Sequence, residues 1–112
     1  MEQIYNKLVR DRIPEIIKNN GEEPIIEILN DKEYKNELEK KLYEEYLEVI
    51  ESKGESRLEE LADMISVIAS LAKLENKDLS DIINISTKKD EKRGSFDKKI
   101  YLKKVLINRW LK

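Results

Sequence analysis

Residues 31–75 read DKEYKNELEKKLYEEYLEVIESKGESRLEELADMISVIASLAKLE and contain the pattern that decides the fold. Apolar side chains recur along this stretch every three to four residues, which is the spacing of an amphipathic helix. One helix is predicted over 31–51 and another over 56–75, with Gly54 between them. The second helix opens on Ser56-Arg57-Leu58-Glu59, a capping-box pattern that satisfies free N–H groups at a helix start. The sequence therefore predicts two long helices joined by a short turn.

Shorter elements are predicted on the N-terminal side of this helix pair. Asp11 can cap a short helix that carries Pro14 in its first turn and that Gly21 ends. The segment 24–29 is short and rich in β-branched residues, so it is either a strand or an extended crossing segment.

One more helix is predicted on the C-terminal side, from Asp78 or Ser80 to about Asp90. The tail 97–112 has apolar residues at both helical and alternating spacings, so its state stays open. Together these elements predict an all-α fold, a helical bundle with one short extended segment. The length of 112 residues predicts a single domain over 1–112.

The composition excludes several classes of function. The chain has 22 Lys and Arg and 24 Asp and Glu, so it lacks the basic field that holds nucleic acid. It has no Cys and no His, which excludes thiolate nucleophiles, Cys-ligated zinc and an imidazole base. Residues 1–10 lack the apolar core of a signal peptide, and no stretch reaches the roughly 18 apolar residues of a membrane span. These observations predict a cytoplasmic protein that binds neither nucleic acid nor membrane.

Four carboxylates on the two long helices occupy unusual positions. At about 100° per residue, Glu45 falls on the apolar face of the first helix and Glu48 lies beside that face. On the second helix, Glu60 falls within a wide apolar face and Asp63 lies on its edge. Each pair has i, i+3 spacing, so antiparallel packing of the helices would bring the two pairs together.

Buried carboxylates are costly unless they are paired or bind a metal ion. Oxygen ligands without imidazole or thiolate favour Mg²⁺, with Mn²⁺ as a substitute, and Mg²⁺ often binds phosphate oxygens as well. The pattern therefore predicts a Mg²⁺–phosphate site. Its predicted ligands are Glu45, Glu48, Glu60 and Asp63. A second interpretation is that Lys41 and Arg57 form salt bridges with these acids.

These carboxylates resemble a known signature. Glu44-Glu45-Tyr46-Leu47-Glu48 followed by Glu60-Leu61-Ala62-Asp63 is similar to the EExxE…ExxD motif of the all-α NTP pyrophosphatases, the superfamily of MazG, dimeric dUTPases and phosphoribosyl-ATP pyrophosphohydrolase. The segments 5–14, YNKLVRDRIP, and 92–96, KRGSF, are similar to those of a MazG-like branch labelled phosphoribosyl-ATP pyrophosphohydrolase-like. The chain departs from this pattern in the slightly short gap between the two halves of the motif, and in Ser95, where the branch often has a glycine.

The resemblance implies a Mg²⁺-dependent house-cleaning hydrolase that cleaves a nucleoside triphosphate between its α and β phosphates, giving a monophosphate and pyrophosphate. The four predicted ligands would hold the metal ion, which lowers the pKa of an attacking water. Glu44 would support the cluster or help orient the water. Candidate phosphate-binding cations are Lys7, Arg10, Arg12, Lys89, Lys92 and Arg93.

Several alternatives remain open. The substrate could be phosphoribosyl-ATP, as in histidine biosynthesis. The chain could instead be a catalytically silent helical module that binds a nucleotide or a partner protein through the same acidic groove, or a purely structural helical dimer. The second long helix carries more apolar surface than a lone bundle of this size needs, which predicts a homodimer or a larger homo-oligomer.

Overall fold

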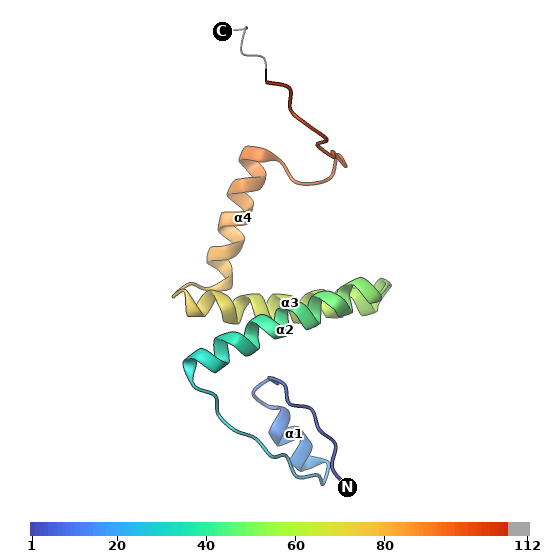
Figure 1. The fold of residues 1–112 in the computed structure, drawn as a ribbon, viewed down its shortest axis with the longest axis vertical. Coiled ribbons are helices and arrows are strands. Elements are labelled where there is room, and N and C mark those ends of the chain that lie inside the picture. Colours follow the sequence, from blue (N-terminus) through green and yellow to red (C-terminus); the bar gives the residue numbers. More distant parts are fainter. Residues whose placement is uncertain (108–112) are drawn as a thin grey trace. The chain divides into compact units, whose positions relative to one another are not determined.

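Within residues 1–107, the part that the computed structural model describes, the chain forms four helices and no strand. The helices are α1 (Ile13–Asn19), α2 (Asp31–Glu51), α3 (Gly54–Leu74) and α4 (Leu79–Arg93) (Figure 1). The prediction of an all-α fold is confirmed, and 24–29 forms a drawn-out connection rather than a strand. The chain separates into two compact units, Met1–Leu79 and Ser80–Lys112, and the single domain expected over 1–112 stays a prediction.

The helix α2 begins and ends where the sequence predicts, but its cap is Asn30. The Asn30 side chain accepts a hydrogen bond from the backbone N–H of Glu33 at 2.9 Å. The Glu33 carboxylate in turn accepts one from the backbone N–H of Asn30 at 3.3 Å. This capping box satisfies two backbone donors at the helix start and so fixes it at Asp31.

The capping box predicted at Ser56 is wrong, because α3 begins two residues earlier, at Gly54. Only a very short turn joins the two long helices. Arg57 bridges this turn: its Nε donates to the carbonyl oxygens of Val49 at 3.2 Å and Ser52 at 3.0 Å. Gly54 has a φ of 59°, a left-handed conformation that glycine adopts without steric cost. Arg57 therefore caps the end of α2 instead of pairing with an acid.

The predicted cap of α1 is also wrong. Its N-cap residue is Arg12 rather than Asp11, and no side chain caps this helix. Pro14 favours the start because its ring fixes a helical φ. The prediction that Gly21 ends the helix is confirmed. Gly21 has a φ of 82°, and its N–H donates to the carbonyl oxygen of Lys18 at 2.9 Å.

The antiparallel pair α2 and α3 forms the core of the first unit (Figure 1). The buried apolar side chains are Leu38 on α2 and Val67 and Ala72 on α3. Many large apolar side chains on the same helices are exposed. They include Tyr43, Tyr46, Ile50, Leu58 and Ile65. Apolar surface of this kind is what a homo-oligomer would bury.

The second unit contains α4 from its second residue onward and the tail. The helix starts at Leu79, between the two predicted starts, and continues to Arg93 rather than Asp90. It ends at Gly94, whose φ is 82° and whose N–H donates to the carbonyl oxygen of Asp90 at 2.8 Å. Residues 97–107 form neither helix nor strand, and the rest of the tail lies outside the described residues. Within the described part, no helix is both long and apolar enough to cross a bilayer.

Candidate metal centre

Three carboxylates meet where α2 packs against α3. They come from Glu45, Glu60 and Asp63, and one oxygen from each lies within 4.8 Å of the other two. Oxygens that bind one cation at about 2.0–2.6 Å lie up to about 5 Å apart, so a single ion can contact all three. The structure therefore contains a group of acids that could bind a metal ion, at three of the four predicted ligand positions.

Helix register explains why these side chains meet. Glu45 follows Leu38 by two helical turns and so shares its buried face; it is only 6% exposed. On α3, Glu60 and Asp63 are spaced i, i+3, and Asp63 is followed one turn later by the buried Val67. The same spacing that packs the two helices therefore carries three carboxylates into their interface.

Two oxygens of this group lack a partner. As ionised groups, Glu45 Oε2 and Glu60 Oε2 are buried without a hydrogen-bond partner among the described residues. Lys41 Nζ lies 3.7 Å from the other Glu45 oxygen, Oε1, and 3.7 Å from Glu44 Oε2. The salt-bridge interpretation therefore accounts for one oxygen of Glu45 and leaves the other uncompensated. An uncompensated buried oxygen is costly, and a bound cation would remove that cost.

The crowding of negative charge shifts two pKa values upward. A hydrogen bond with Glu48, then burial, then the charges of Glu48, Asp63 and Glu45 raise the pKa of Glu60 from 4.5 to about 7. Burial, followed by the charges of Glu48 and Asp63, raises the pKa of Glu45, and Lys41 opposes this shift. Without a metal ion, the cluster therefore holds a proton near neutral pH.

Stability and metal affinity should respond to pH in opposite directions. The folded-state pKa of Glu60 lies above its ordinary value, so its protonation stabilises the fold below about pH 4.5, and this stabilisation is lost as the pH rises to about 7. We expect the metal-free free energy of unfolding to fall over this range. Mg²⁺ competes with the proton, so its affinity should rise over the same range.

Urea unfolding with a chelator and Mg²⁺ titrations, both at pH 5 and pH 8, measure the two trends. The absence of His leaves few other groups that titrate in this window. Glu60→Gln serves as the control, because it removes the group whose pKa is raised to about 7. Equal metal-free stability of the wild-type protein at both pH values would contradict the prediction.

The remaining predicted site residues of the first unit differ in their placement. Arg10 reaches the cluster: its Nη2 donates to Asp63 Oδ1 at 2.8 Å and to Ser66 Oγ at 3.3 Å. Glu48 is exposed and lies outside the three-carboxylate group, although it hydrogen-bonds Glu60. Glu44 is half-exposed beside Lys41.

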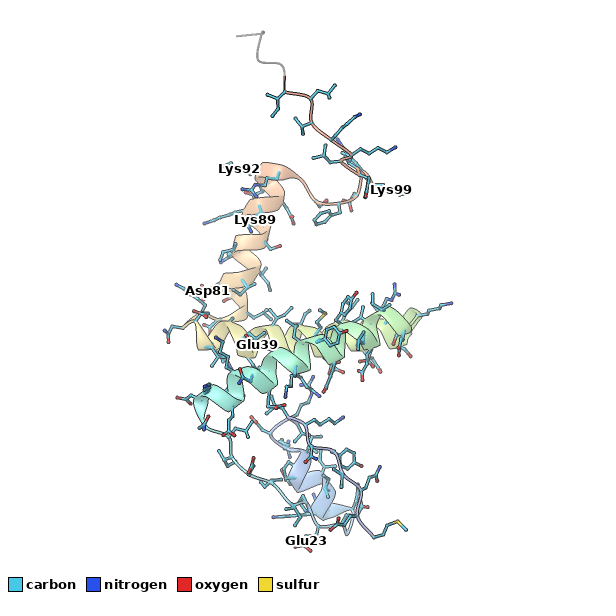
Figure 2. The ribbon with its side chains drawn as sticks, in the orientation of Figure 1. Glu23, Glu39, Asp81, Lys89, Lys92 and Lys99 are labelled. Atoms are coloured by element: carbon cyan, nitrogen blue, oxygen red, sulfur yellow. The ribbon has the colours of Figure 1, made fainter. Side chains whose placement is uncertain are left out.

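Two other predicted cations contact residues outside the cluster. Lys7 lies 5.9 Å from the ring centre of Tyr5, and Arg12 pairs with Glu15 at 3.3 Å. Three more lie in the last turns of α4, in the second unit, where Figure 2 shows Lys89 and Lys92. These three are Lys89, Lys92 and Arg93. Their role in binding phosphate stays a prediction.

A cavity of about 410 Å³ adjoins the cluster, and the hydroxyl groups in its lining were not predicted from the sequence. Tyr34, Ser66 and Ser70 contribute hydroxyl groups to it. The helix register could have identified the two serines. Ser66 and Ser70 follow Asp63 at helical spacing and so share its face.

Comparisons with known proteins assign neither a family nor a function to this chain. No family model matches the chain, and no solved structure matches it. A segment of 43 residues is 51% identical to an uncharacterized protein of Mycolicibacterium smegmatis. The alignment covers 38% of this chain and 44% of the relative, so less than half of that protein's length is matched.

Proposed function

We propose that this protein is a Mg²⁺-dependent, MazG-like nucleotide pyrophosphohydrolase that cleaves a nucleoside triphosphate between its α and β phosphates. The observation that carries the proposal is the pair of buried oxygens, Glu45 Oε2 and Glu60 Oε2, which lack a hydrogen-bond partner among the described residues. They belong to a group of three carboxylates close enough to share one cation. Such a group is difficult to explain as a salt-bridged surface, because its most buried member is 6% exposed.

The donor set favours Mg²⁺, or Mn²⁺ as its substitute. Glu45, Glu60 and Asp63 offer only carboxylate oxygens, which suit hard cations. Glu48, whose charge helps to raise the pKa of Glu60, would complete the ligand set. When bound, the ion would polarise a phosphoryl oxygen and lower the pKa of a nearby water.

The chain's own residues would supply proton handling and positive charge. The raised pKa of Glu60 suits this carboxyl group to release its proton near neutral pH when a metal ion binds. Glu44 lies at the half-exposed edge, where it would help orient a water. Arg10 and Lys41 border the cluster and would bind substrate phosphates, Arg10 through its two-pronged guanidinium.

We further propose that the protein acts in the cytoplasm as a homodimer or larger homo-oligomer. The exposed apolar side chains of α2 and α3 support this state. Sedimentation of the purified chain measures the oligomeric state directly.

Pyrophosphate release from a panel of ribo- and deoxyribonucleoside triphosphates tests the proposed reaction. With Mg²⁺ present, we expect at least one of them to be hydrolysed to its monophosphate. Glu60→Gln and Asp63→Asn should each lower the rate at least about tenfold, because each removes a metal ligand. Glu59→Gln, an exposed neighbour on α3, is the matched control. No pyrophosphate release with either Mg²⁺ or Mn²⁺, or full activity in both ligand variants, would refute the proposal.

A further inference from the structure

Two segments of the described chain form neither helix nor strand and leave their backbone unpaired. They are residues 22–29, between α1 and α2, and residues 98–107, after α4 (Figure 1). Among the described residues, no backbone–backbone hydrogen bond involves residues 23–29 or 100–107. Each segment therefore presents a row of free donors and acceptors, and such a row can pair with a strand of another chain.

Large apolar side chains on both segments are exposed. In the first segment, Ile25, Ile26 and Ile28 are 58–90% exposed. The second segment carries six such side chains, which are 69–85% exposed: Ile100, Tyr101, Leu102, Val105, Leu106 and Ile107. Isoleucine, valine and tyrosine are among the residues that favour strands. Contiguous apolar surface of this kind marks a site of interaction with another protein.

The two segments carry opposite charges. Residues 22–29 contain three acids and no base, and residues 98–107 contain four lysines and no acid. All seven charged side chains are exposed, and none forms a salt bridge within the described residues. Glu23 and Lys99, one from each segment, are labelled in Figure 2. The segments are therefore complementary in charge and alike in apolar character.

The order of the residues is complementary as well. Residues 22–27 read EEPIIE, and residues 98–104 read KKIYLKK. When Ile25 lies opposite Tyr101, every glutamate faces a lysine and each of the three apolar residues between them faces another apolar residue. The lysine pairs flank their apolar residues symmetrically, so this match holds for parallel and antiparallel strands alike. Opposite charges and apolar pairs across two strands both stabilise strand pairing.

We propose that residues 22–27 of one copy of the chain pair as a β-strand with residues 98–104 of a second copy. Two copies related by a twofold axis form two such pairs, because each copy contributes one segment of each kind. A single two-stranded pair is marginally stable in water, so the second pair and the exposed apolar side chains of α2 and α3 add to the association. The inference rests on the proposed homo-oligomer and is independent of the proposed hydrolysis.

Disulfide crosslinking tests this pairing, because the chain has no cysteine of its own. Full-length Ile25→Cys is mixed with affinity-tagged, full-length Tyr101→Cys, and the mixture is oxidised with diamide. Opposite residues on paired strands have Cα atoms about 4.5–5.5 Å apart, a distance that a disulfide spans. The control replaces Tyr101→Cys with Ile85→Cys, at an exposed position of α4 outside both segments. We expect the mixed dimer to form at least about tenfold faster than in the control.

Charge reversal tests the pairing without a crosslink. Replacing the three glutamates of residues 22–27 with lysine should weaken association of the copies about tenfold or more, because like charges then face each other. Replacing the four lysines of residues 98–104 with glutamate should have the same effect. Mixing the two variants should restore association, since both pairs then join opposite charges, and this rescue excludes misfolding as the cause of the loss. Sedimentation of each variant and of the mixture measures the association.

Several results would overturn the inference. An oligomeric protein whose mixed disulfide forms no faster than the control, or whose charge-reversal variants associate like the wild type, would show that the copies meet through other surfaces. A double variant, Ile25→Cys with Tyr101→Cys, that crosslinks only within one chain would exclude the second copy as the partner. A wild-type chain that sediments as a monomer would refute both this inference and the proposed homo-oligomer. Pyrophosphate release would still support the proposed hydrolysis in each case.

Discussion

Replacing Glu45 with glutamine is expected to abolish Mg²⁺-dependent activity and at the same time to stabilise the metal-free protein. Glu45 is 6% exposed, and burial and neighbouring carboxylates raise its pKa. Among the described residues, the cation in contact with it is Lys41, whose Nζ lies 3.7 Å from Glu45 Oε1. The fold therefore places this carboxylate where its ionised form is costly. Glutamine keeps the shape of the side chain and removes that charge.

The two effects have different sizes. Removing an uncompensated buried charge should raise the metal-free free energy of unfolding by on the order of 1 kcal/mol. Losing the most buried ligand should weaken Mg²⁺ binding and pyrophosphate release at least about a hundredfold, since even outer-shell changes at metal sites cost about 10–100-fold. The opposite signs are informative, because a variant that merely misfolds would lose both stability and activity.

Urea unfolding with a chelator measures the stability change, and titration with Mn²⁺ or Mg²⁺ measures the affinity. Glu39→Gln is the matched control: it makes the same substitution at an exposed position of α2, seen in Figure 2, and should change neither quantity. A Glu45→Gln protein that binds Mg²⁺ normally would remove Glu45 from the ligand set. If Mg²⁺ leaves the melting temperature of the wild-type protein unchanged, the cluster has a purely structural role.

Helix register could be predicted from the sequence, and it located the buried acids. Glu45 lies on the apolar face defined by Leu38, and the structure buries both residues. Glu48, which lies beside that face, is exposed. The α-helix is rigid and periodic, so the direction of each side chain follows from its position in the chain. The ends of α2 followed from the same pattern.

Contacts between distant parts of the chain could not be predicted in this way. Even the start of α3 is predicted two residues late, because Arg57 hydrogen-bonds carbonyl oxygens at the end of α2, a contact that the capping-box pattern at Ser56 does not indicate. Arg10 contacts Asp63 across 53 positions of sequence. The irregular segment 24–29 lies between them and gives no periodic signal for how the chain returns.

Replacing Arg10 with glutamine should strengthen metal binding and weaken nucleotide binding. In the structure the Arg10 guanidinium donates to Asp63 Oδ1 at 2.8 Å, so it competes with a cation for this carboxylate. Both side chains of this ion pair are well exposed, 59% for Arg10 and 42% for Asp63, so the pair contributes less than about 1 kcal/mol to stability. The fold should therefore tolerate the substitution.

The proposed role of Arg10 changes when metal and substrate bind. If Mg²⁺ binds at Asp63, the Arg10 guanidinium would lose its hydrogen bond to this carboxylate and would be free to bind a phosphate through two parallel hydrogen bonds. Arg10→Gln should lower kcat/KM at least about a hundredfold, as expected when a donor to the developing negative charge is lost. Arg10→Lys keeps the positive charge but cannot form two parallel hydrogen bonds, so its kcat/KM should lie between those of Arg10→Gln and the wild-type protein.

Lys40→Gln separates this role from a general change in charge. Lys40 pairs with Glu37 on α2 and does not line the cavity, so its removal changes net charge equally without touching the site. Titration with Mn²⁺ and binding of a non-hydrolysable nucleotide analogue give the two affinities independently. Two results would contradict the proposed role of Arg10. Arg10→Gln would shift both affinities in the same direction, or it would shift them no further than Lys40→Gln does. Opposite shifts require one side chain that opposes the cation and favours the nucleotide, and Arg10 is the residue hydrogen-bonded to Asp63.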